Sequence, residues 1–226
     1  MYKNSKSCLE MGCPYFIAYT YLHLLLGVLI SSAAAVYDPL GKLGINTESI
    51  LPSIVILISS FVLLYICLMQ KPGVLKYILF GIFITLIGSS LRSILERLRA
   101  KQILVNVLLT ISSIFLTMTV LGFIDKQNTL GFGPYLFASL IGLILGHLGI
   151  GAALLFKVPG EQLSGISYAI SFISTLVFSI FVAYDTQMLK EDAAACKSHP
   201  DYINSALSLY LDILNLFVSV GDLADS

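Results

Sequence analysis

Seven long apolar segments decide what this chain can fold into. Each runs for roughly 20 residues with few charges, and a helix of that length crosses the hydrocarbon core of a bilayer. Because backbone groups cannot go unpaired in lipid, such segments fold as helices rather than as an open sheet. The sequence therefore predicts an all-α integral membrane protein with seven transmembrane helices, at residues 15–36, 50–69, 74–91, 103–124, 134–156, 163–188 and 202–220.

The composition supports a membrane protein and narrows its partners. Charged residues make up only 12% of the chain, whereas soluble domains carry about 25%. The formal net charge is zero, so nothing favours a nucleic-acid partner and the lipid bilayer is the expected one. The short connections contain no linker, which predicts a single membrane domain over residues 1–226 with a short N-terminal tail at 1–14. No nucleophile elbow, phosphate loop or HExxH motif occurs, so we expect neither an enzyme nor a bound cofactor.

The last apolar segment carries a polar stripe. Residues three and four apart share one helix face, and this face has no Lys or Arg. A helix lying on the membrane surface would need a strongly charged, usually basic face. A narrow stripe of Ser, Asn and Asp instead favours contact with other helices or a water-filled cavity, and hence a central position. Its members are Asp201, Ser205, Ser208, Asp212, Asn215, Ser219 and Asp222.

The sixth segment allows two interpretations. Ser167, Ser171 and Ser174 lie on or near the helix face of Asp185, as a polar lining would. Serines are equally common where helices contact one another. In the fifth segment, His147 could titrate near neutral pH, or it could simply hydrogen-bond a neighbouring helix.

Asp185 and Asp212 place carboxyl groups in apolar surroundings. An Asp at the centre of a spanning helix costs about 2.5–3.5 kcal/mol, and no Lys or Arg well inside the segments is expected to compensate it. Close carboxylates cannot both ionise cheaply, so the pair is expected to share a proton or to bind Ca²⁺ through its oxygens. The alternative for Asp185 is a helix end among headgroups, because Lys190, Glu191 and Asp192 follow closely.

Two motifs identify a family resemblance. FVAYDTQMLK at 181–190 and HPDYINSALSLYLDILNLF at 199–217 resemble the Bax inhibitor-1 family, also called the transmembrane Bax inhibitor motif family. Both motifs occur in the family's order and at its separation. The resemblance implies six helices around a central C-terminal helix. It also implies a pH-sensitive Ca²⁺ leak across an internal or bacterial membrane, with protection from cell death in eukaryotic members.

The resemblance also assigns roles and partners. It implies that Asp185 and Asp212 share a proton and govern opening, with Ca²⁺ and protons as the ions handled. Endoplasmic reticulum or Golgi is the implied membrane, and cell-death regulators or other membrane channels are the implied protein partners. A non-conducting interaction protein that restrains such factors is the alternative function. Some family members have a basic latch residue on an early helix; residues 50–69 have none, which leaves Lys71 or Arg92. The side chains expected to support the site are Ser171, Ser174, Ser208 and Asn215.

Overall fold

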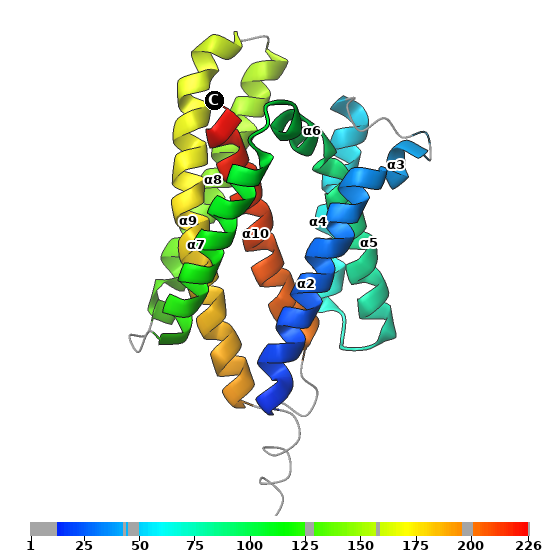
Figure 1. Ribbon diagram of the computed structural model, residues 1–226, viewed down its shortest axis with the longest axis vertical. Helices are drawn as coiled ribbons and strands as arrows, with labels where there is room; N and C mark the ends of the chain where they lie inside the picture. Colours follow the sequence, from blue (N-terminus) through cyan, green and yellow to red (C-terminus); the bar gives the residue numbers. More distant parts are fainter. Residues whose placement is uncertain are drawn as a thin grey trace, which may run out of the picture. The chain divides into compact units, whose positions relative to one another are not determined.

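The described part of the protein is almost entirely helical, and its residues form no strand. The computed structural model describes residues 13–42, 44, 50–124, 129–156, 159–195 and 201–225 (Figure 1). Most of the predicted N-terminal tail at 1–14 lies outside these residues, and the first described helix begins at Cys13.

Helices occupy every one of the predicted apolar segments. The long ones are α2 (Cys13–Tyr37), α4 (Ile50–Met69), α5 (Val74–Ser90), α7 (Leu104–Ile124), α8 (Gly133–Leu155), α9 (Gly160–Ala195) and α10 (Tyr202–Asp225). The short ones are α3 (Pro39–Lys42), α6 (Arg92–Ala100) and the 3₁₀ turn η1 (Thr129–Phe132).

Five of these helices are long and apolar enough to cross a bilayer: α2, α7, α8, α9 and α10. The pair α5 and α6, bent by 40°, would add a sixth, and the described part of α4 counts as a shorter apolar helix, Val55–Met69. Large apolar side chains such as Leu116 and Leu145 are exposed on these helices, which suits contact with lipid. The prediction of a multi-pass helical membrane protein is confirmed.

The chain forms two compact units. Unit 1 comprises Met1–Arg97 with Glu191–Tyr210, and unit 2 comprises Leu98–Lys190 with Leu211–Ser226. Helix α10 is continuous and contributes its first turns to unit 1 and the remainder to unit 2.

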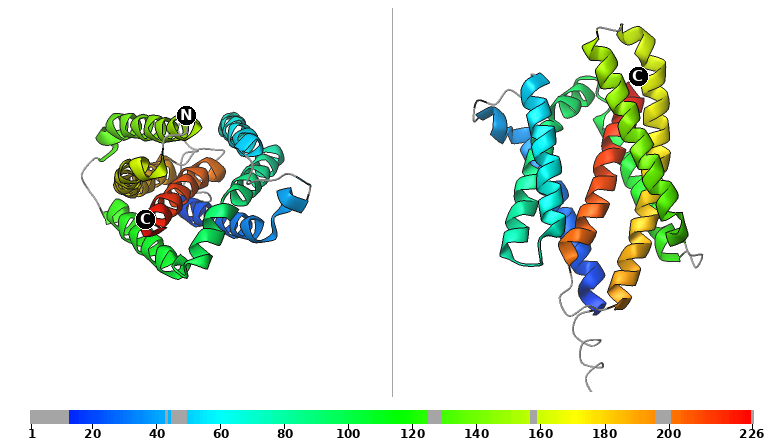
Figure 2. Two further views of the ribbon diagram at one scale, coloured as in Figure 1. Left: turned by 90° about the horizontal axis from the view of Figure 1, so that it is seen from above. Right: turned by 180° about the vertical axis from the view of Figure 1, so that it is seen from behind.

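Within unit 1, α2 and α5 cross at glycines. A Cβ added at Gly88 would lie 2.3 Å from the carbonyl oxygen of Ser31, so the two backbones touch there. Gly27 similarly leaves room for the ring of Phe80. In Figure 2, α4 and α5 run side by side in opposite directions and are joined by a short turn. Small residues allow this close approach, as is usual between membrane helices.

The basic segment at 90–101 continues as a separate helix. After the bend, α6 buries Leu98 and exposes Arg99. Arg92 forms ion pairs with Asp38 at 3.1 Å and with Glu96 at 2.8 Å. Arg92, which the sequence left as a candidate latch residue, is thus paired with Asp38 and Glu96.

Candidate functional site: a pair of carboxyl groups

The two aspartates singled out from the sequence meet in unit 2. The side chains of Asp185 on α9 and Asp212 on α10 lie close enough to interact with each other. An ionised carboxylate can only accept hydrogen bonds. A hydrogen bond between the two carboxyl groups would therefore need a proton on one of them.

The two partners are buried to different degrees. Asp212 is 3% exposed, whereas Asp185 is half-buried. The second oxygen of Asp212, Oδ2, is buried without a hydrogen-bond partner among the described residues. Buried polar atoms are almost always paired, so this oxygen has free capacity for a proton or a cation.

Close packing holds Asp185 in place. Helix α9 extends past it to Ala195, so Asp185 is not at a helix end. A Cβ added at Gly122 of α7 would lie 2.6 Å from the carbonyl oxygen of Ala183 and 2.8 Å from Cβ of Thr186. Helix α7 therefore presses directly on the turn of α9 that carries Asp185.

The buried face of α9 combines serines with apolar residues. Ser171 and Ser174 are both buried, and Oγ of Ser174 has no hydrogen-bond partner among the described residues. Phe178 and Val182 follow on this face and are also buried. The structure thus places the predicted serines on the face that leads to Asp185.

The polar stripe of α10 is divided between different surroundings. Ser208 and Asn215 are half-buried, and Asn215 donates its side-chain amide to the backbone oxygen of Leu211 at 2.7 Å. Asn215 thus bonds its own helix. In α10, 50% of the spanning window is buried, against 11–28% in the other four candidate spans. Apolar α10 side chains such as Leu207 and Leu216 are fully buried as well.

The side chain of His147 contacts the backbone of its own helix. It is exposed on α8, and its Nδ1 donates to the backbone oxygen of Leu143 at 2.8 Å. The histidine bonds its own helix rather than a neighbouring one.

The carboxyl pair offers few ligands for a resident metal. The part of the chain that the structure describes contains no group of three or more His, Cys, Asp or Glu side chains arranged to hold a metal ion. Ca²⁺ takes 6–8 oxygen ligands. Asp185 and Asp212 could supply only part of that set.

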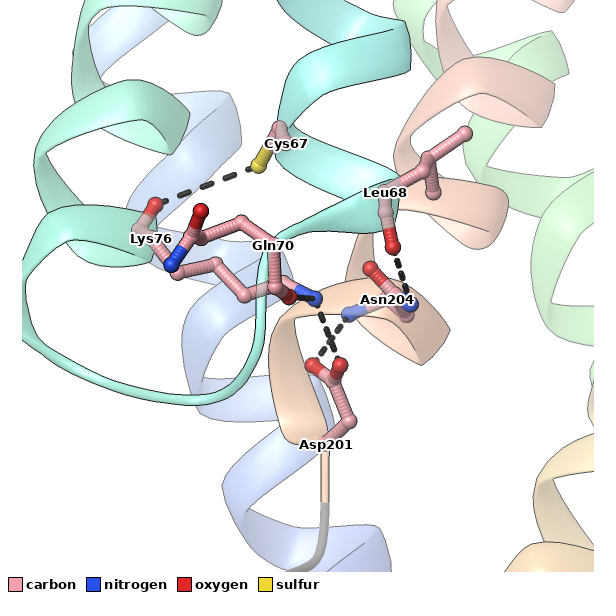
Figure 3. Close-up of polar contacts among 6 residues, drawn as sticks. All are labelled: Cys67, Leu68, Gln70, Lys76, Asp201 and Asn204. Carbon is pink, nitrogen blue, oxygen red and sulfur yellow. Dashed lines mark hydrogen bonds and ion pairs between the residues drawn. The ribbon is translucent and has the colours of Figure 1, made fainter.

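One functional group was missed from the sequence. Lys76, in the first turn of α5, is fully buried and forms an ion pair with Asp201 (Figure 3). Lys76 lies near the helix end and pairs with Asp201, so it does not compensate Asp185 or Asp212. Its partner is a carboxylate 125 residues away. The sequence offered one signal for this pair: Lys76 lies near the start of the apolar segment at 74–91, and Asp201 directly precedes the segment at 202–220.

The comparison with known proteins decides the family. Residues 14–223 match the family described as inhibitor of apoptosis-promoting Bax1, Bax1-I. The chain belongs to the Bax1-I family. This match confirms the resemblance inferred from the motifs at 181–190 and 199–217.

Relatives of this Bax1-I protein include bacterial membrane proteins. It is 29% identical over 218 residues to the inner membrane protein YbhL of Escherichia coli, an alignment covering 92% of this chain and 89% of YbhL. It is 33% identical over 124 residues to the uncharacterized membrane protein SpyM3_0260 of Streptococcus pyogenes, covering 54% and 51% of the two chains. These relatives support a multi-pass membrane location.

Proposed function

We propose that this protein is a pH-sensitive calcium leak protein gated by the proton that Asp185 and Asp212 share. The observation that carries the proposal is the placement of the buried Asp212 side chain beside that of Asp185, where one proton can form a hydrogen bond between them. Such a bond joins α9 to α10 only while one proton is present. The proton is therefore also a structural link between two helices.

Loss of that proton replaces the attraction between Asp185 and Asp212 by repulsion. Two carboxylates in contact repel each other, and two unit charges 4 Å apart interact by about 4 kcal/mol at an effective dielectric constant of 20. Deprotonation thus weakens the contact between α9 and α10 and creates a doubly negative site that attracts Ca²⁺. We expect the leak to increase as pH rises through the titration of the pair and to close as the proton returns.

The number of membrane crossings, the position of α10 and the cellular membrane are further parts of the proposed function. We propose seven membrane crossings, in which α4 and the bent α5–α6 segment add two to the five clear spans and the other six helices surround a central α10. The large buried share of α10 supports this arrangement. A cytoprotective, anti-apoptotic role and an endoplasmic reticulum or Golgi location follow from the resemblance to eukaryotic members. The named location among the relatives is a bacterial inner membrane.

The test is Ca²⁺ flux from loaded proteoliposomes over a pH series on both sides of neutrality. Asp185→Asn and Asp212→Asn remove the shared titration, so both variants should lose the pH response. Glu161→Gln is the matched control, because it removes an exposed charge from the first turn of the same helix α9. Wild-type flux and an unchanged pH response in both Asn variants would refute the assignment of the gate.

The family description favours one second candidate. It names inhibition of the apoptosis-promoting factor Bax1, which supports a non-conducting protein that binds cell-death factors or membrane channels. Binding and protection that survive both Asn substitutions, in a protein without measurable flux, would select this function. Neither candidate requires a catalytic group or a cofactor.

A further inference from the structure

Three helix ends of unit 1 meet at Lys76 (Figure 3). Its ammonium group donates to Oδ2 of Asp201 at 2.5 Å and to the backbone oxygen of Gln70 at 3.0 Å. Asn204, in the first turn of α10, donates its side-chain amide to the backbone oxygen of Leu68 at 3.3 Å. These contacts join the beginning of α10 to the end of α4 and the beginning of α5.

Each contact also satisfies a helix end. Leu68 lies in the last turn of α4, and Gln70 directly follows that helix. Backbone carbonyl groups at a helix C-terminus lack partners within the helix. A cation is favourable there because it complements the helix dipole. Asp201 precedes α10, and its Oδ1 accepts the backbone N–H of Asn204 at 3.1 Å, as an N-cap does.

The burial of Lys76 makes it energetically unfavourable to separate the ion pair. The Lys76 side chain is fully buried, and that of Asp201 is 26% exposed. Separating a buried pair leaves a charge without compensation, which is much less favourable than removing both charges together. A displacement of α10 along its axis would break the ion pair and the Asn204 bond at the same time.

We propose that Lys76 and Asp201 are positioning residues that fix the axial position of α10, the helix that carries Asp212. Helix α10 is unbroken from Tyr202 to Asp225, so Asp212 lies about 16 Å further along the same rod, at 1.5 Å per residue. The anchor at the first turn therefore determines how far the rod can slide. In its functional consequence this inference rests on the proposed calcium leak.

The first arm of the test is structural and independent of flux. Asp201→Asn leaves the charge of Lys76 buried without its acid partner, and Lys76→Met leaves the partly exposed Asp201 without its cation. The Asp201→Asn substitution keeps a side-chain oxygen that can cap the helix. Each single variant should melt at a lower temperature than the double variant Lys76→Met/Asp201→Asn, which removes both charges. Amide hydrogen exchange at 203–206 should accelerate about tenfold or more in the double variant, as expected for losing a hydrogen bond to a charged group. Wild-type exchange there would overturn the positioning role.

The second arm measures the pH profile of Ca²⁺ flux in the double variant, which retains Asp185 and Asp212. Loss of the anchor should change the flux at a given pH by about fivefold or more, the lower limit of typical coupling between linked sites. Lys42→Met is the control, because it removes an exposed lysine from unit 1 that takes no part in these contacts. A stable double variant with the wild-type profile would overturn the inference, while Asp185→Asn would still report on the gate. If no protein conducts, the proposed function fails, and hydrogen exchange alone decides the positioning role.

Discussion

The contact between α7 and α9 beside Asp185 predicts a large effect from a single methyl group. In Gly122→Ala, the new Cβ would lie 2.6 Å from the carbonyl oxygen of Ala183 and 2.8 Å from Cβ of Thr186. Both neighbours are attached to the backbone of α9 and cannot rotate away. Contacts closer than 3.4 Å are already tight, so the helices must separate by 3.4 − 2.6 = 0.8 Å at this point.

The magnitude follows from overpacking. Extra methyl groups in a packed interior typically cost about 1–3 kcal/mol. For a chain of this size, each kcal/mol lowers the melting temperature by about 2–4 °C. The separation occurs on the turn that carries Asp185, so the hydrogen bond to Asp212 should lengthen and the pH dependence of the leak should weaken together with stability.

The assay compares Gly122→Ala with Gly142→Ala. Gly142 lies on α8 in the same unit, and a Cβ there would meet nothing within 4 Å. Purified variants are heated in detergent and the remaining monodisperse protein is measured by size-exclusion chromatography, followed by flux measurements in liposomes. Equal melting temperatures and equal pH profiles for the two alanine variants would refute the reasoning.

Three further predictions test other contacts. Gly88→Ala should lower the melting temperature more than Gly122→Ala does, because its Cβ would lie 2.3 Å from a backbone oxygen of α2, while Gly81→Ala on the same helix meets nothing within 4 Å and should be neutral. A Gly81 variant as unstable as the Gly88 variant would contradict this. Asp212→Asn should hold the leak in its low-flux form at all pH values, because a neutral amide can donate permanently to Asp185; high flux at acid pH would argue against the gate. Ser174→Ala should leave stability equal or higher, because its buried hydroxyl has no hydrogen-bond partner among the described residues. A loss of flux in this variant would assign the hydroxyl to a polar pathway.

The prediction from sequence succeeded where the information is local. Apolar length identifies the helices, and the three-and-four spacing around Asp212 identifies a polar stripe along the last of them. It could not assign the ion pair of Lys76, because a lysine near the start of a helix usually extends to the headgroups. Nor could it show that Asn215 bonds its own helix, since the same amide could equally reach across to a neighbour.

The sequence by itself determined the membrane environment, the helical segments, the family and the two carboxylates. Each of these depends on hydrophobicity, helical periodicity or a short motif, which are properties of neighbouring residues. Only the tertiary structure decided that Asp185 lies beside Asp212 and that Lys76 is buried against Asp201. Those facts arise where segments far apart in the chain pack together, and there the loss of water makes the pairing of each charge or hydrogen-bonding group decisive.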